Sequence, residues 1–255
     1  MRPRLDPVFL TTPLAHRALH DVTDGRPENS RAAILAAIAR GYGIEIDVQL
    51  SADSAAMVFH DYALDRLAEG SGAVRARTAS VLAQTTLRGG SEGIPSLPEV
   101  LALVAGRVPV LIEIKDQDGA MGDQIGPLEA ATANALQDYV GPVAVMSFNP
   151  HSVARMAELC PDIPRGLVTS GYDPGEWPLS QATCEALRAI PDYDRVEASF
   201  VSHDAADLSR PRVAELKAAG ANILCWTIKS PEAEAEARKV AQNVTFEGYL
   251  AAHPG

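Results

Sequence analysis

The chain has 255 residues, of which 47% are apolar and 22% charged, a composition typical of globular proteins. Its 22 basic and 33 acidic residues give a net charge of −11, which disfavours binding to nucleic acid or to an anionic membrane through charge alone. No apolar run reaches the ~18 residues of a membrane span, and the N-terminal apolar stretch is too short for a signal peptide. Three separated cysteines without a CxxC pair argue against a zinc knuckle or a disulfide framework and favour a cytoplasmic protein.

Short apolar runs alternate with alanine-rich stretches of helical spacing along the whole chain. The runs rich in Val, Ile, Leu and Phe predict buried strands at 7–15, 42–50, 55–60, 108–115, 141–148, 163–170, 195–200, 221–229 and 244–251. The alanine-rich stretches predict helices at 29–41, 97–106, 127–139, 149–160, 181–190, 210–220 and 231–241. Gly41 and Gly106 at helix ends, and the pair Asn149-Pro150 at a helix start, support these boundaries.

The alternation of strand and helix repeats about eight times, which predicts an α/β fold with a parallel sheet. The repeat number favours a (β/α)8 TIM barrel over a doubly wound sheet, and no GxGxxG motif follows the first strand. We expect a single domain over 1–255. Residues 61–96, rich in Gly, Ser, Arg and Thr, are expected to form a small loop-rich excursion after strand two.

Carboxylates interrupt two strongly apolar strands. Glu45 and Asp47 alternate with apolar residues, so the two-residue period of a strand places both side chains on one face. Like charges on a buried face repel, which leaves two interpretations: a salt-bridged pair near the strand end, or ligands of a divalent cation. Glu113 and Lys115 repeat the pattern, either as an ion pair with the first two carboxylates or as a third ligand beside a cation that faces substrate. Three carboxylates suit Mg²⁺ or Ca²⁺ better than Zn²⁺.

Histidines end two of the predicted strands. His16 follows the first strand and His60 ends the run 55–60, at the edge where barrel enzymes build their active sites. A lone histidine there is more often structural, but two beside carboxylates favour a general acid–base pair. His20 is expected to be an exposed loop residue. His203, expected just after a strand, is a weaker candidate for a substrate contact.

Several short motifs occur in a fixed order along the chain. They are A-H-R and P-E-N-S (15–30), G-I-E-I-D-V (43–48), V-F-H-D-Y-A-L-D-R (58–66), I-P-S-L-P-E-V-L (94–101), L-I-E-I-K (111–115), S-F-N-P (147–150) and W-T-I (226–228). In this combination the sequence resembles the glycerophosphodiester phosphodiesterase family over nearly its whole length. The family fold is a TIM barrel, which agrees with the strand–helix alternation.

The resemblance implies a metal-dependent hydrolase that splits a small-molecule glycerophosphodiester into glycerol 3-phosphate and an alcohol. At the positions that match the family motifs, it implies a divalent metal, Mg²⁺ or Ca²⁺, held by Glu45, Asp47 and Glu113. It implies His16 and His60 as general acid and base.

Four further positions are implied to bind substrate: Arg17 and Lys115 at the phosphate, and Phe148 and Trp226 at the glycerol. Glu28 is similar to a residue that supports the site from behind, or it stabilises the first turn of the following helix.

Three segments depart from the family pattern. Ala18 stands where glycine is usual, 51–55 replaces a common T-x-D-G turn, and 245–249 lacks the usual aspartate-rich ending. A positive φ at Ala18 would cost roughly 1 kcal/mol or more. These departures bear on substrate choice more than on activity. Two alternatives remain: a lysophospholipase D or cyclising phosphodiesterase with the same site, and a barrel that binds a phosphate ester without turnover.

Overall fold

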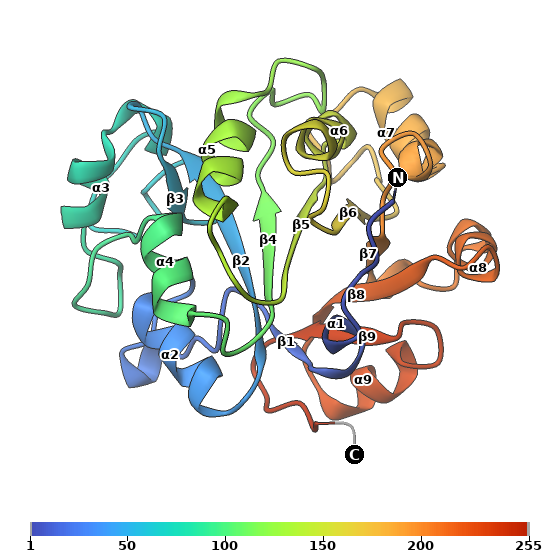
Figure 1. The fold of residues 1–255 in the computed structure, drawn as a ribbon, viewed down its shortest axis with the longest axis horizontal. Coiled ribbons are helices and arrows are strands. Elements are labelled where there is room, and N and C mark those ends of the chain that lie inside the picture. The colour runs from blue at the N-terminus through green and yellow to red at the C-terminus, as the bar shows by residue number, and fades with distance from the viewer. Residues whose placement is uncertain (1, 254–255) are drawn as a thin grey trace.

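The computed structural model describes residues 2–253, whose strands close into a parallel barrel (Figure 1). Neighbouring strands run in the order β1-β9-β8-β7-β6-β5-β4-β2, and β2 pairs again with β1 to close the ring. The barrel strands are β1 (Leu14–Ala15), β2 (Gly43–Leu50), β4 (Val110–Ile114), β5 (Val143–Ser147), β6 (Arg165–Thr169), β7 (Phe200–Asp204), β8 (Asn222–Ile228) and β9 (Asn243–Phe246). The TIM-barrel prediction is confirmed.

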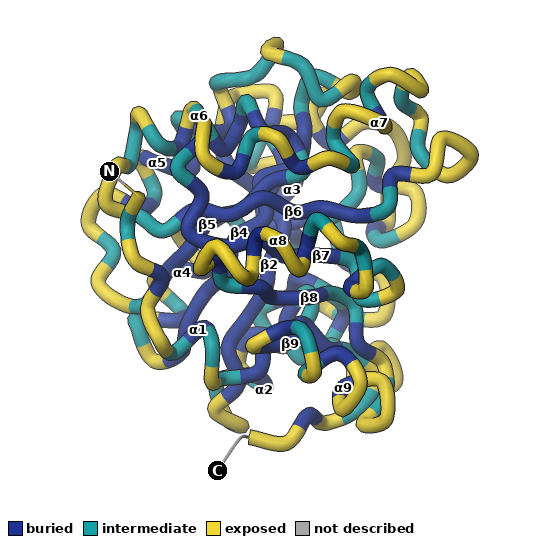
Figure 2. Tube along the Cα trace, turned by 90° about the vertical axis from the view of Figure 1, so that its right-hand side faces the viewer, coloured by how far each residue is buried: buried dark blue, intermediate teal, exposed yellow. Residues whose placement is uncertain are grey.

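Helices connect the strands and cover the outside of the barrel (Figure 1). They are α2 (Arg31–Ala39), α4 (Leu97–Val104), α5 (Pro127–Leu136), α6 (Pro150–Leu159), α7 (Gln181–Arg188), α8 (Pro211–Ala218) and α9 (Pro231–Ala237). Figure 2 shows the strands as buried and the outer turns of the helices as exposed. Ile46 of β2 and Ile112 of β4 belong to the apolar cluster that the strands share with these helices. This packing turns the alternate residues of the same strands toward the barrel axis.

The strand predicted over 7–15 is wrong for most of its length. Val8–Thr11 form the short helix α1, and only Leu14–Ala15 join the sheet. A short apolar run carries no periodicity that separates a strand from one turn of buried helix. Phe9 of α1 packs with Leu14 and other residues at the starts of the strands, and its backbone oxygen accepts a hydrogen bond from Asn243 Nδ2 at 2.8 Å. Helix α1 therefore closes the N-terminal end of the barrel.

Two other predicted strands differ from the structure. The run 55–60 contributes β3 (Ala56–Val58), which pairs antiparallel with β2 and lies outside the barrel because its short connection allows only a hairpin. The strand predicted at 195–200 starts only at Phe200 and runs to Asp204. Glu197 has a φ of 50°, which interrupts extended backbone before that point. His203 therefore lies within β7 and not after it.

Residues 61–96 form the excursion beyond β3. They include a turn of 3-10 helix, η2 (Val74–Ala76), and a helix that the sequence analysis does not predict, α3 (Ala79–Gln84). Apolar side chains of this segment, such as Leu82 and Ile94, bury Phe59 in a cluster separate from that of the barrel. Within residues 2–253, no helix is both long and apolar enough to cross a membrane.

Candidate active site

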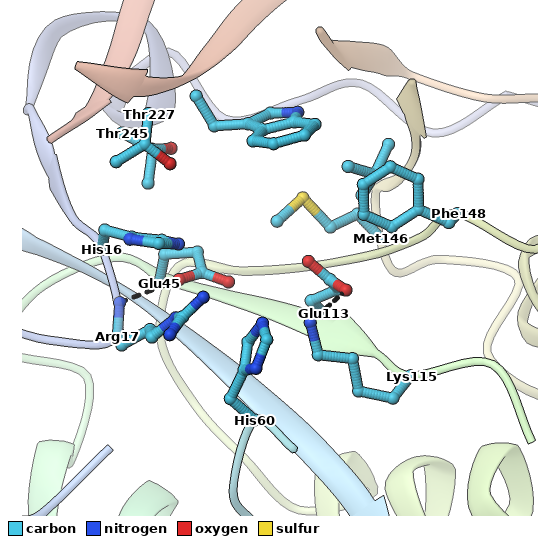
Figure 3. A pocket seen from close by; sticks show the side chains of 12 residues that line it. His16, Arg17, Glu45, His60, Glu113, Lys115, Met146, Phe148, Thr227 and Thr245 are labelled. Carbon is cyan, nitrogen blue, oxygen red and sulfur yellow. Dashed lines mark hydrogen bonds and ion pairs between the residues drawn. The ribbon is translucent and has the colours of Figure 1, made fainter. Parts of the chain in front are cut away.

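A pocket of about 100 Å³ opens at the C-terminal end of the barrel strands (Figure 3). Eight of the sequence-predicted site residues line it: His16, Arg17, Glu45, His60, Glu113, Lys115, Phe148 and Trp226. Asp47 and Glu28 lie behind this lining and contact it. The predicted residues, which are spread over most of the chain, thus converge on one place.

Three carboxylates form the acidic part of the pocket. Asp47 of β2 lies directly beside Glu113 of β4 in the parallel register, and Glu45 precedes Asp47 by one full strand period. All three side chains are buried, and each offers an oxygen within 4.8 Å of the others. The apolar residues between them face the helices, which leaves the carboxylates no other direction than the barrel axis.

Lys115 neutralises part of this charge. Its Nζ donates to Glu113 Oε1 at 2.6 Å and lies 2.7 Å from Asp47 Oδ1. Burial favours the neutral amine, but these two carboxylates outweigh it and raise the pKa of Lys115. The ion-pair interpretation of Lys115 is therefore correct for its contacts, and the side chain still reaches the pocket wall.

The three carboxylates differ in pKa. Burial raises the pKa of Glu45 well above its usual range, and the charges of Asp47 and Glu113 add to this effect. The pKa of Glu113 is raised mainly by burial as well. For Asp47, burial is outweighed by Lys115, so its pKa is lowered. Lys115 and the nearby Arg17 thus do not offset the burial of Glu45 and Glu113.

This donor set fits a hard divalent cation. Three buried oxygen ligands from rigid strands suit Mg²⁺ or Ca²⁺, and a cation among them would relieve the repulsion that raises the pKa of Glu45 and Glu113. Asn29 fixes the outer side of the set, since its Nδ2 donates to Asp47 Oδ2 at 3.0 Å.

Arg17 enters the pocket from the loop after β1. Arg17 and Ala18 both have left-handed backbone, with φ of 52° and 64°, so Ala18 adopts the positive φ whose cost the sequence analysis considers. This turn aims the Arg17 backbone N–H at Glu45 Oε2, 2.9 Å away. The Nε of Arg17 is buried without a hydrogen-bond partner among the described residues. A buried donor of this kind is costly unless a ligand meets it.

Glu28 holds the other end of the Arg17 guanidinium. Its Oε1 accepts from Arg17 Nη1 at 2.8 Å, and Arg66 of the excursion binds the same carboxylate. The start of α2 is instead capped by Ser30, whose Oγ accepts from the N–H of Ala33. These contacts favour support of Arg17 over stabilisation of the helix.

Each pocket histidine is oriented by a carboxylate. His16 Nδ1 lies 2.5 Å from Glu247 Oε2, and His60 Nδ1 lies 2.7 Å from Asp61 Oδ1. Nε2 is therefore the ring nitrogen left for the pocket in both cases. Burial lowers the pKa of His16, against the opposing hydrogen bond to Glu247. Burial together with the Lys115 charge lowers the pKa of His60 to about 4.

The opposite wall is apolar. Phe148 and Trp226 meet edge to face with ring centroids 5.5 Å apart, and Trp226 Nε1 donates to the backbone oxygen of Ser202 at 3.0 Å. Met146 and Val168 complete this wall. Beyond Trp226 lies a second, more polar cavity of about 640 Å³, with Trp177, carboxylates and arginines in its lining.

Several site residues escape the sequence analysis. Glu247 enters it only as part of a departing C-terminal segment, yet it orients His16 because β9 lies beside β1. That Glu247 follows the last strand as His16 follows the first is a signal that could have found it. Thr227 and Thr245 also line the pocket.

Two further histidines differ from expectation. His20 is only 24% exposed in its side chain and lies 3.7 Å from Glu247 Oε2, so the exposed loop position is wrong. His203 is fully buried, bonded to Thr169 Oγ1 at 2.7 Å and to Asp207 Oδ2 at 3.1 Å. His203 itself lines neither the pocket nor the second cavity, although its partner Asp207 lines the latter, so its position does not support a direct substrate contact.

Comparison with known proteins agrees with this geometry. Residues 16–245 match the model of the glycerophosphoryl diester phosphodiesterase family. The chain belongs to this family. It is 30% identical over 234 residues to the "Putative glycerophosphodiester phosphodiesterase YhdW" of Bacillus subtilis (strain 168), which covers 88% of each chain. The prediction of a phosphodiesterase family enzyme is thereby confirmed.

Solved structures share the fold at lower identity. A phosphodiesterase of Oleispira antarctica, solved with the product sn-glycerol-3-phosphate, superposes with a TM-score of 0.76 and 24% identity over 94% of this chain and 93% of that one. A structure from Agrobacterium tumefaciens has a TM-score of 0.75 and 21% identity, over 93% of each chain. These likenesses establish the barrel architecture of this glycerophosphoryl diester phosphodiesterase family member.

Proposed function

We propose that the protein hydrolyses glycerophosphodiesters to glycerol 3-phosphate and an alcohol. The observation that carries this proposal is the presence, in and behind one small pocket, of three carboxylates, a half-buried arginine and two histidines that are oriented by carboxylates. An anionic phosphodiester needs cationic contacts and proton transfer on both sides of the phosphorus, and these groups supply them. Membership of the family and the product bound to the Oleispira antarctica relative support the same substrate class.

Glu45, Asp47 and Glu113 would hold a divalent cation, Mg²⁺ or Ca²⁺. Bound there, the cation supplies positive charge at a phosphate oxygen, which is typically worth several kcal/mol in such reactions. Lys115 holds Asp47 and Glu113 in place through its two ion pairs, and its charge lowers the pKa of Asp47.

Arg17 binds the phosphate. Its buried Nε–H makes no hydrogen bond among the described residues, although Nε lies 3.8 Å from Asp47 Oδ2, and Glu28 fixes the far side of the guanidinium. The Nε edge can therefore donate to an anion. His16 and His60 act through Nε2 as the proton-transfer pair. One removes a proton from the attacking oxygen and the other protonates the departing alkoxide, each step being worth ~10²–10⁴-fold. Glu247 and Asp61 hold the two rings in the tautomer that this requires.

The pocket surroundings favour a polar alcohol over a fatty acyl substituent. The apolar hollow behind Phe148 has a volume of about 10 Å³, room for roughly one water molecule. The spacious neighbour of the pocket is the second cavity, whose lining includes Asp173, Glu176 and Arg210. A small hydrophilic alcohol fits this environment. The acyl chain that the lysophospholipase D alternative requires would not fit the apolar hollow at Phe148.

The test is release of glycerol 3-phosphate from a panel of glycerophosphodiesters with Mg²⁺, with Ca²⁺ and with a chelator. We expect release that depends on the metal and is lost in Glu45→Gln. Release of a cyclic phosphate would instead support the cyclising alternative. Binding of the substrates without any product, in the presence of either metal, would support the non-catalytic barrel and contradict the proposal.

A further inference from the structure

Two hydroxyl groups inside the barrel have no hydrogen-bond partner among the described residues. They are Thr245 Oγ1 on β9 and Ser202 Oγ on β7, and both side chains are buried. A buried hydroxyl without a partner destabilises the folded protein, because it has given up its hydrogen bonds to water. Such a group calls for an explanation, and a missing ligand is one of them.

The two hydroxyls differ in where they lie. Thr245 lines the catalytic pocket together with Thr227, and Figure 3 draws both threonines on the wall above His16. Ser202 does not line the pocket. Of these two residues only Thr245 therefore combines an unsatisfied hydroxyl with a position in the pocket lining, which makes Ser202 a natural control within the same barrel.

The chemistry of Thr245 matches a neutral partner. Several titratable groups of the pocket already pair with one another: Asp47 and Glu113 with Lys115, and the two histidines with Glu247 and Asp61. A threonine hydroxyl both donates and accepts, so it pairs with another hydroxyl without changing the charge of the site. It also stands at the edge of the apolar wall of Met146 and Trp226, where a carbon chain that bears hydroxyls would lie.

We propose that Thr245 is a specificity-determining residue whose hydroxyl binds a hydroxyl of the glycerol moiety of the substrate. This proposal rests on the glycerophosphodiesterase function proposed above. The substrate hydroxyl supplies the hydrogen bond that the free protein lacks at Thr245. Sites that hydrogen-bond a substrate hydroxyl in this way reject analogues without it, because the protein group is then left unpaired in the complex.

The experiment compares substrates that share one leaving alcohol. The first carries glycerol, the second lacks the terminal glycerol hydroxyl, and the third lacks the middle one. For the wild type we expect kcat/KM to fall at least tenfold for one of the two deoxy analogues. Thr245→Val keeps the shape of the side chain and removes its hydroxyl, so the same analogue should then react about as well as the glycerol substrate. Thr245→Ser should restore the discrimination.

Ser202→Ala serves as the matched control, and Thr227→Val tests the neighbouring hydroxyl. Thr245→Val and Ser202→Ala should each raise Tm, by about 2–4 °C, since each removes an unsatisfied buried hydroxyl. Only Thr245→Val should change the ratio of kcat/KM between substrates. This split between stability and selectivity distinguishes a substrate contact from a structural hydroxyl.

Three results would overturn the inference while leaving the proposed function intact: undiminished discrimination in Thr245→Val, an equal loss for all three substrates, or transfer of the effect to Thr227→Val. Absence of glycerol 3-phosphate release by the wild type on the first substrate would instead reject the proposed function.

Discussion

The two sides of the pocket differ in the chemistry of their side chains. On the side of β1, β2 and β4, the lining consists of titratable side chains, several of which are paired with one another, as in the contacts of Lys115 with Asp47 and Glu113. On the side of β5, β6 and β8, the lining is apolar and aromatic, with Phe148 and Trp226 at its centre. A substrate would interact with charged groups on one side and bury its apolar surface on the other.

This difference separates rate from binding. Ionised groups in a buried site act strongly on charge that develops during a reaction, because the low dielectric does not screen them. Apolar contacts are non-directional and stabilise the ground state and the transition state alike. Substitutions on the charged side should therefore lower kcat, and substitutions on the aromatic side should raise KM.

The largest effect is expected for Glu45→Gln. The change removes one of three carboxylates without altering its shape, so kcat should fall by roughly 10³-fold or more, equivalent to about 4 kcal/mol. Stability should not fall, since burial beside two other carboxylates already raises the pKa of Glu45 and disfavours its charge. Steady-state kinetics and thermal unfolding check both points. Glu236→Gln on α9, exposed and not part of the pocket lining, is the charge-matched control, and a comparable loss there would contradict the assignment.

His60→Gln should have the next largest effect. Loss of a proton-transfer group is expected to lower kcat ~10²–10⁴-fold while KM changes little. The exposed His253, which lies near the C-terminus, provides the comparison through His253→Gln. A variant of His60 that raised KM and left kcat intact would place this histidine on the binding side of the comparison.

Trp226→Leu should show the opposite kinetic pattern. The variant loses the aromatic face and its edge-to-face contact with Phe148. Such a contact contributes about 0.5–1.5 kcal/mol in addition to the burial of apolar surface, so KM should rise about tenfold. The metal dependence should be unchanged. Trp177→Leu, at the adjoining cavity, is the matched variant and should leave KM for the glycerol part nearly constant. Equal decreases in kcat for both variants would contradict the proposal that the aromatic side acts on KM and the charged side on kcat.

The smallest effect concerns stability and pH, at His203 on β7, outside the pocket lining. Burial lowers the pKa of His203 below its usual 6.5, against the opposing contact with Asp207. The unfolded chain therefore binds a proton that the folded chain does not, and stability falls as pH drops through the region below 6.5. The free energy of unfolding of wild type should thus approach that of His203→Gln as pH falls from 8 to 5. A gap that widens at low pH would show that the imidazole is buried as its charged form.

The charged side was the more predictable from sequence. Glu45 and Asp47 stand out because the two-residue period and the apolar composition of a buried strand can both be recognised from a few neighbouring residues. The parallel register then brings Glu113 beside Asp47. Glu247 was not identified as a site residue, because its role depends on the closure of β9 against β1 at opposite ends of the chain. Thr245 looks like any β-branched strand residue until its unpaired hydroxyl is placed in the pocket.

The misplaced strands have a similar cause. The run 7–15 is apolar because α1 closes the N-terminal end of the barrel. A buried helical turn and a buried strand both require apolar residues, so the composition does not distinguish them. The late start of β7 follows from the left-handed backbone of Glu197, a conformation that the residue type of a glutamate does not predict. In both segments, the composition predicted which residues are buried, but it did not predict the backbone conformation.

His60 lies where the barrel meets the excursion, and this has a consequence for the lifetime of the active state. The preceding Phe59 belongs to the core of the excursion, and Arg66 connects that segment back to Asp61 and Glu28 across the exposed surface. Parts of a protein with separate apolar clusters open with separate free energies. Opening of the excursion alone would remove one histidine from an otherwise folded barrel. Heat should therefore abolish turnover before the barrel melts, with amide hydrogens of residues 61–96 exchanging ahead of those in β2 and β4.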